Sequence, residues 1–423
     1  MSEAALVTET PSGIRVVSEA VPAVRSVALG MWIRTGSRDE DVAEAGVSHF
    51  LEHLLFKGTP NHSAIEISET LDGMGAYFNA FTGKEVTSLH ARFLDNHLDD
   101  AFGLLGEMLL ESTFPDIDSE RQVVIEEIAM YDDEPASKVH DLLSKAVFGD
   151  SPIGRPIIGR AEVISSISVD DIRAYHADKY TAPNIVISAA GSVDHDRLVE
   201  LAASLTPGAG SGNEIETAPP ARSGQTVFES KETEQFHVCF GTPSISRSDE
   251  RRFALAVLDS LLGGSSSSRL FREIREERGL AYSVGTYAEQ LTDTGVFAIH
   301  TGTRTENIEL VCELIGKEVN KLLDAGVPEE ELERAREHVK GRLVLSEESN
   351  AARMNRIGRA VLHDMPILSL DEMLARVDAV TGSDIDQLAS ELFSGRVLDA
   401  AAIGPDEERF RSAVDELQGA LSA

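Results

Sequence analysis

His49-Phe50-Leu51-Glu52-His53 is the most informative run of this sequence. In a helix, side chains four positions apart project from the same face, so His49 and His53 would lie close enough to share one divalent ion. Glu52 follows His49 by three positions and borders the same face. The order H-x-x-E-H is the inverted form of the H-E-x-x-H zinc signature. The run therefore predicts a helix that presents two metal ligands and one acid.

The residues on either side of this run suit a helix over 46–57. Apolar side chains surround the run, Lys57 places a cation at the C-terminal end, and Gly58 supplies a C-cap. Packing histidines on a half-apolar helix are the alternative that these five residues leave open. Other parts of the chain have to separate the two interpretations.

The length and composition limit the classes of protein that come into question. A chain of 423 residues is too long for one core and predicts two or three domains. It has no apolar run of the ~20 residues that span a bilayer, and its first 13 residues have no signal or transit character, so we expect a cytoplasmic protein. Only Cys239 and Cys312 are present, which excludes a disulfide scaffold and a thiolate cage. A bound metal would need nitrogen and oxygen ligands.

The net charge of −34 bears on the partners of the protein. It argues against nucleic acid, because phosphate binding needs clustered lysine and arginine. An acidic chamber that attracts basic peptides, a need for solubility, or a salt-rich habitat would each explain it, and the charge alone does not choose among them. We expect neither a nucleic-acid partner nor a membrane partner.

A segment rich in glycine and proline, residues 206–226, divides the chain near its midpoint and is predicted to be a linker. We predict an N-terminal domain over 1–205 and a C-terminal domain over 227–423. A shift of 213 residues aligns the later parts of the two halves, which indicates a duplicated domain. The aligned positions are Phe114-Pro115-Asp116 with Val327-Pro328-Glu329, Asp171-Ile172 with Asp384-Ile385, and Gly191 with Gly404.

Both halves mix strands and helices in a similar order. Adjacent strand pairs with helices gathered elsewhere favour an α+β fold, in which each half is a β-sheet packed with helices. Expected strands cover 13–20, 27–34, 76–82, 86–93, 185–191, 236–241, 281–289, 295–301 and 398–404; expected helices cover 46–57, 63–71, 97–112, 118–148, 168–180, 251–262, 268–277 and 381–393.

Two histidines leave a catalytic zinc ion one protein ligand short. Either Glu126 or Glu127, on the predicted helix 118–148, could complete the site, with Glu120 behind it as a supporting carboxylate. A solvated acidic face is the alternative that spacing leaves open. With three ligands, the metal would acidify a water molecule, and Glu52 would pass its proton to a leaving amine. This chemistry is amide hydrolysis.

Four motifs together resemble the pitrilysin/insulinase (M16) family of zinc peptidases. They are HFLEH at 49–53, EEI at 126–128, NAFT at 79–82, and the run from Ser268 to Val284. More narrowly, the chain is similar to short bacterial members related to the mitochondrial processing peptidase β subunit. The resemblance spans nearly the whole chain. It implies the metallohydrolase fold of that peptidase and one Zn²⁺ per chain.

The resemblance also implies roles for single residues around the metal. His49, His53 and Glu127 match the zinc ligands of the family, which selects Glu127 over Glu126. Glu52 matches the catalytic base, and Glu120 matches the carboxylate outside the ligand set. Under the 213-residue shift Lys340 stands opposite Glu127, and 251–263 contains no H-x-x-E-H. We therefore expect metal in the first half only.

Further matches concern the substrate. Asn79 and Ala80 match the strand on which the family binds extended peptides by strand addition. Arg275 and Tyr282 match an arginine–tyrosine pair that reaches the substrate near the metal. A hairpin asparagine and a packed strand tyrosine are the alternatives for Asn79 and Tyr282.

The sequence thus predicts a zinc endopeptidase that cleaves unfolded peptides or presequence-like segments. Larger family members enclose a chamber with two such domain pairs, so the resemblance implies a homodimer in which the partner protomer supplies Arg275 and Tyr282. A heterodimer with a second, inactive chain is the alternative assembly. The alternative function is a catalytically silent structural or partner subunit of the same fold.

Overall fold

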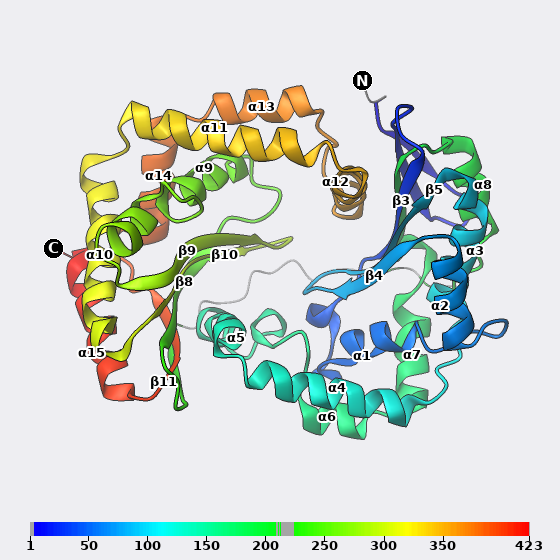
Figure 1. The fold of residues 1–423 in the computed structure, drawn as a ribbon, viewed down its shortest axis with the longest axis horizontal. Helices are drawn as coiled ribbons and strands as arrows, with labels where there is room; N and C mark the ends of the chain where they lie inside the picture. Colours follow the sequence, from blue (N-terminus) through cyan, green and yellow to red (C-terminus); the bar gives the residue numbers. More distant parts are fainter. Residues whose placement is uncertain (1–3, 209, 211, 213–223, 423) are drawn as a thin grey trace. The chain divides into compact units, whose positions relative to one another are not determined.

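The computed structural model describes residues 4–208, 210, 212 and 224–422. These residues form two compact units, which are described separately below (Figure 1). Unit 1 lies within Met1–Met130, Arg155–Glu216 and Leu345–Ser369, and unit 2 lies within Tyr131–Gly154, Thr217–Val344 and Leu370–Ala423. Most of the predicted linker over 206–226 falls outside the described residues.

Unit 1 is built on a six-stranded sheet with the order β1-β2-β6-β3-β5-β4. β2 and β6 pair in parallel, the other neighbours pair antiparallel, and β4 lies at an edge. The predicted hairpin is confirmed, because β4 and β5 are joined through a bond from Gly83 N to Val86 O of 2.7 Å. The strands are β1 Leu6–Glu9, β2 Arg15–Ala20, β3 Ser26–Ile33, β4 Tyr77–Thr82, β5 Thr87–Leu94 and β6 Ile185–Gly191.

The helices of unit 1 bury their apolar faces in one core with this sheet. Phe50, Leu51 and Leu54 are fully buried in that core, so their helix is fixed by its apolar side. The helices are α1 Val47–Leu54, α2 Ala64–Gly73, α3 Leu98–Glu111, α4 Ile117–Asp132, α6 Ala161–Ser166, α7 Val169–Lys179, α8 His195–Ser204 and α12 Asn350–Leu362. The helix expected over 46–57 thus ends at Leu54 and continues as turns.

Unit 2 repeats five strands of the sheet of unit 1, and the residues described contain no counterpart of β1. Its strand order is β7-β11-β8-β10-β9, with β7 and β11 parallel, the other neighbours antiparallel, and β9 at an edge. The strands are β7 Thr226–Ser230, β8 Phe236–Ser244, β9 Ala281–Gln290, β10 Gly295–Thr303 and β11 Asp399–Gly404. The shared order and directions are those expected of a duplicated domain.

Helices cover the sheet of unit 2 as well. A π-helical turn, Phe271–Glu276, leads towards β9. The α-helices are α5 Pro135–Phe148, α9 Arg252–Leu262, α10 Ile308–Ala325, α11 Glu329–Ser346, α13 Leu370–Asp378, α14 Gly382–Phe393 and α15 Glu407–Ser422. Among the residues described, no helix combines the length and apolar character needed to cross a membrane.

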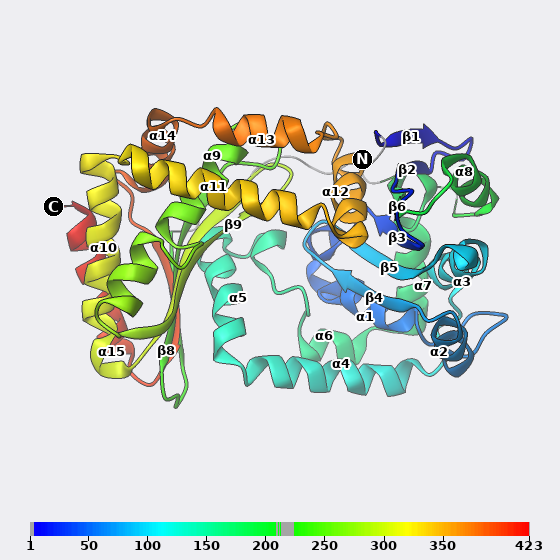
Figure 2. The same ribbon diagram turned by 45° about the horizontal axis from the view of Figure 1, so that its top comes forward.

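One helix of each half packs on the sheet of the other half. α5 comes from the first half, yet it covers β8 and β11 in unit 2 through Val139, Leu143 and Val147. α12 comes from the second half, yet it covers β2, β3 and β6 in unit 1 (Figures 1 and 2). The compact units therefore differ from the predicted limits 1–205 and 227–423 in these two segments. A linear search for linkers does not detect an exchange between two similar sheets.

The expected helix over 118–148 is in fact two helices. α4 ends at Asp132 and α5 begins at Pro135. Proline has no backbone N–H and disfavours helical geometry at the residue before it, so it suits the first position of a new helix. This break separates the helix that carries Glu127 from the helix that joins unit 2.

Buried ion pairs hold α12 on the sheet of unit 1. Glu19 of β2 has a side chain only 4% exposed, and it contacts Arg353 and Arg356, the latter at 2.6 Å. Glu347 lies 3.2 Å from Arg353 and 2.7 Å from Arg356. Two acids thus share two guanidinium groups, and each charge removed from water is compensated.

Removing Glu19 should therefore release α12. Glu19→Ala leaves both arginines short of a partner, and we expect a loss of about 3 kcal/mol in the free energy of unfolding of unit 1. Faster hydrogen exchange over 350–362 would report the release. Arg376→Ala is the control, because it removes an exposed pair with Glu250 of 2.7 Å and should cost under ~1 kcal/mol. Equal effects of the two substitutions would contradict the account.

Candidate metal centre

The start of α1 is fixed by a buried carboxylate. Glu40 accepts backbone hydrogen bonds from Gly46 N at 2.7 Å and Ser48 N at 2.8 Å. Gly46 has φ +102°, a left-handed conformation that favours glycine. With its apolar side in the core, α1 turns His49, Glu52 and His53 to its half-buried side. The predicted helix therefore presents these three side chains together.

α4 brings Glu127 to the two histidines. Glu127 Oε1 lies 3.7 Å from His49 Nε2, and Glu127 Oε2 lies 3.2 Å from His53 Nε2. One ligand atom from each residue lies within 4.8 Å of the other two, and no second group of this kind occurs among the residues described. Two imidazoles and one carboxylate are a donor set that suits zinc and keeps a fourth position open. The neighbouring Glu126 is exposed and lies outside the group.

The two histidines differ in what holds their second nitrogen. His53 Nδ1 lies 2.8 Å from Glu120 Oε1, which leaves Nε2 to face Glu127. His49 Nδ1 is buried and meets no hydrogen-bond partner in the part of the chain that the structure describes. Burial lowers the pKa of His49 to about 4, with a smaller contribution from His53, so His49 is neutral at pH 7, as a metal ligand must be.

Glu120 has the predicted supporting position outside the ligand group, but the residue of the group that it contacts is His53. We expected this carboxylate behind Glu127. The other oxygen of Glu120 lies 2.5 Å from Lys57 Nζ. The sequence predicts Lys57 only as a cation at a helix end and does not reveal its contact with Glu120. Its position four residues after His53 was the available signal.

Glu52 lies beside the ligand group and is held by the edge strand. Thr82, the last residue of β4, donates a hydrogen bond of 2.5 Å to Glu52 Oε2. Burial raises the pKa of Glu52, and the bond from Thr82 opposes this. Thr82 belongs to the NAFT motif, but no local pattern in the sequence predicts its contact with Glu52. One carboxylate oxygen of Glu52 is thus held by the edge strand.

Asn79 and Ala80 lie on β4, an edge strand whose outer side pairs with no strand in the described part of the chain. Asn79 is exposed, and its Oδ1 accepts the backbone N–H of Ala80 at 2.9 Å. This bond caps an amide that would otherwise face solvent. A peptide that adds to β4 would have to take over that amide.

Arg275 and Tyr282 lie together in unit 2. Arg275 Nη1 donates to the backbone oxygen of Tyr282 at 2.8 Å, and its guanidinium carbon lies 4.7 Å from the centre of the tyrosine ring. Tyr282 is 78% exposed. The alternative of a packed strand tyrosine is therefore wrong.

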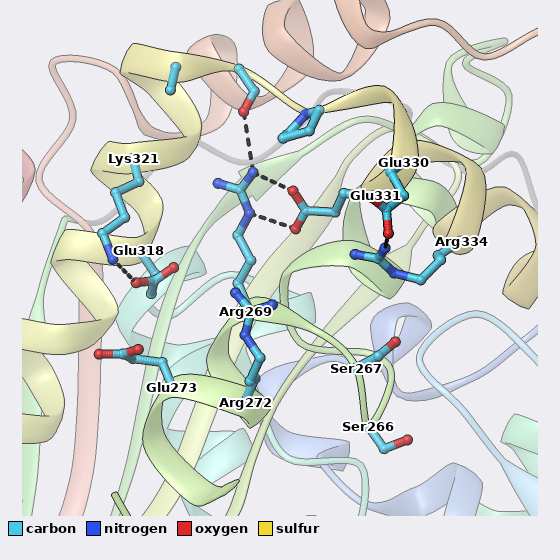
Figure 3. Close-up of a pocket in the computed structure, with 13 residues that line it drawn as sticks. Ser266, Ser267, Arg269, Arg272, Glu273, Glu318, Lys321, Glu330, Glu331 and Arg334 are labelled. Carbon is cyan, nitrogen blue, oxygen red and sulfur yellow. Dashed lines mark hydrogen bonds and ion pairs between the residues drawn. The ribbon is translucent and has the colours of Figure 1, made fainter. Parts of the chain in front are cut away.

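A pocket of about 760 Å³ in unit 2 contains none of the predicted site residues (Figure 3). Its basic side chains are largely paired with acids of the same pocket: Arg269 lies 2.7 Å from Glu331, and Arg334 lies 2.9 Å from Glu330. Four basic and four acidic residues line it, so the charges of the lining residues balance. The histidine group therefore remains the candidate functional site.

Comparisons with known proteins decide the family. The chain matches the family described as Insulinase (Peptidase family M16) over residues 15–161 and the Peptidase M16 inactive domain over residues 166–339. An uncharacterized zinc protease of Streptomyces coelicolor is 39% identical over 413 residues, which cover 95% of this chain and 90% of that protein. The chain belongs to the M16 peptidase family. The predicted family membership is confirmed.

A further relative supports the same assignment, and two solved structures show the same fold. An uncharacterized zinc protease of Bacillus subtilis is 40% identical over 385 residues, 90% of this chain and 94% of that protein. A peptidase M16 inactive domain from Pseudomonas fluorescens has a TM-score of 0.88 at 22% identity, covering 95% of this chain and 98% of that one. A protease from Helicobacter pylori has a TM-score of 0.87 at 22% identity, with 95% and 99% covered. The predicted α+β fold class is confirmed.

The carboxyl group of Glu40 should make stability depend on pH. Burial raises its pKa to about 7 from an ordinary value of 4.5, although the bonds from Gly46 and Ser48 oppose the shift. The folded state binds a proton at Glu40 more tightly than the unfolded chain does. The contribution of Glu40 to the free energy of unfolding is therefore largest below pH 4.5 and is lost as the pH rises to 7. The loss should reach roughly 3 kcal/mol.

Glu40→Gln tests this expectation, because the amide cannot ionise. The stability of the variant relative to the wild type should increase as the pH rises from 4.5 to 7, as measured by chemical denaturation. Glu111→Gln, at an exposed position in α3, is the control and should show no such trend. A stability difference between Glu40→Gln and the wild type that does not change with pH would contradict the raised pKa of Glu40.

Proposed function

We propose that this protein is a zinc-dependent endopeptidase that cleaves unfolded peptides or presequence-like segments. The observation that carries the proposal is the convergence of His49, His53 and Glu127 within 4.8 Å on the side of α1 that also carries Glu52. The naming of its relatives as zinc proteases supports the same class of reaction. The Zn²⁺ is proposed at one per chain.

The residues of the site would divide the work of hydrolysis. Bound zinc would supply a Lewis acid that polarises the scissile carbonyl and acidifies water. Glu52 would take a proton from that water through Oε1 and transfer it to the leaving amine. Thr82 would hold the other oxygen of Glu52 through its 2.5 Å bond. Burial raises the pKa of Glu52 above the ordinary value for glutamate, which makes it a stronger base.

Substrate would bind in extended form along β4. The free edge of β4 offers backbone groups, so peptides would be recognised by strand addition beside Asn79 and Ala80 rather than by deep side-chain pockets. Such binding requires a substrate segment without secondary structure of its own. Broad specificity for unfolded peptides follows from this mode of recognition.

The competing function is a catalytically silent partner subunit of the same fold. A silent subunit has no need for the neutral, buried imidazole of His49, the paired carboxylate of Glu120 and the carboxylate of Glu52 to lie around one metal position. The arrangement around His49 and His53 favours the enzyme.

Metal-dependent cleavage tests the proposal. We expect the purified chain to cleave a quenched peptide, a chelator to abolish cleavage, and Glu52→Gln to lower kcat by ~10²–10⁴ with zinc still bound, because the variant loses only the base. Glu126→Gln, an exposed neighbour of Glu127, is the control and should retain wild-type activity. Zinc uptake without cleavage would identify a metal-binding module, and absence of both would favour the silent subunit.

We further propose a homodimer in which Arg275 and Tyr282 complete the site of the partner protomer. The 78% exposure of Tyr282 leaves its ring available to another molecule, and the guanidinium group of Arg275 orients it. A heterodimer with an inactive chain remains the alternative assembly. We place the protein in the cytoplasm, with peptides rather than nucleic acid or membranes as partners.

Complementation between two inactive variants tests the shared site. Glu52→Gln and Tyr282→Phe should each be inactive, and an equal mixture should recover about one quarter of wild-type activity, because half of the dimers carry one intact site. Light scattering would establish the dimer, and tagged chains would establish subunit exchange. No recovery after confirmed exchange would refute a site completed in trans.

A further inference from the structure

We propose that Lys57 is a positioning residue that sets the zinc affinity of the site through Glu120. This inference rests on the proposed zinc site, but not on the cleavage of peptides. Lys57 would contact neither the metal nor the substrate. It would act by fixing the carboxylate that orients His53.

The contacts form a chain of three side chains. Lys57 Nζ lies 2.5 Å from Glu120 Oε2, and Glu120 Oε1 lies 2.8 Å from His53 Nδ1. The Glu120 side chain is 6% exposed and that of Lys57 is 33% exposed. Each oxygen of a buried carboxylate therefore has its own partner, one cationic and one imidazole.

The backbone around Lys57 is also held in place. Lys57 N donates to Leu54 O at 3.1 Å, and Gly58 O accepts the N–H of Thr113 at 3.0 Å. The turn that follows α1 is thus tied to the helix and to the segment before α4. Lys57 reaches Glu120 from an anchored position, so the contact restricts both partners.

The contacts of Glu120 determine which nitrogen of His53 would face the metal. With Oε2 occupied by Lys57, Glu120 offers Oε1 to His53 Nδ1, and this bond directs Nε2 towards Glu127. His49 has no such side-chain support among the residues described, since its Nδ1 has no hydrogen-bond partner. Among the three proposed metal ligands, His53 is therefore the imidazole that a side-chain contact orients, and that contact belongs to the Lys57–Glu120–His53 chain. Partners of this kind typically change metal affinity by 10–100-fold.

Zinc affinity of the full chain gives the test. We expect Lys57→Met to weaken binding about tenfold, measured by competition with a chromophoric chelator, because the carboxylate loses one anchor. Lys57→Arg keeps the cation and should stay within about threefold of the wild type. In a Glu120→Gln background, Lys57→Met should add no further loss, because its effect passes through Glu120.

The control is Lys317→Met, which removes an exposed ammonium paired with Glu313 in unit 2 and should leave zinc affinity unchanged. Thermal unfolding of the metal-free proteins separates a loss of folding from a loss of affinity. Wild-type affinity in Lys57→Met, or an undiminished effect in the Glu120→Gln background, would overturn the inference. A wild-type chain that binds zinc but cleaves nothing would refute the proposed function alone, whereas a wild-type chain that takes up no zinc would refute both.

Discussion

The burial of one face of α1 is the constraint on which the rest of the molecule depends. Phe50, Leu51 and Leu54 are removed from water in the core of unit 1, and this fixes the rotation of a short helix about its axis. The same rotation turns His49 and His53 towards α4. A helix of eight residues gains little stability from its own hydrogen bonds, so core packing and Glu40 at its start must provide it.

The polar groups near this helix are supported by a few specific contacts. Lys57 and His53 share the two oxygens of Glu120, and Thr82 holds one oxygen of Glu52. Because half-buried ionisable groups are costly without partners, each contact restricts the geometry of the next. The edge strand, the helix and α4 are thereby joined at one point of unit 1.

The two units of the chain are built on the same sheet architecture. Five strands of each sheet have the same order and directions, and each sheet accepts a helix from the other half on one face. The exchange ties the folding of each half to the other, because α12 completes the cover of the first sheet and α5 completes that of the second. Unit 2 keeps the architecture and presents an exposed tyrosine at its edge strand.

The sequence by itself determined the helix that carries His49 and His53, the β4–β5 hairpin, the repeat and the α+β class, because periodicity, turn residues and motif spacing are local properties. It left Glu126 and Glu127 as alternatives until a family resemblance selected one. Only the tertiary structure decided that Glu127 lies beside the histidines and that Glu120 contacts His53 rather than Glu127. It also decided that α5 and α12 each pack on the sheet of the other half. These features are contacts between segments far apart in the chain, and they arise from packing, which no short stretch of sequence contains.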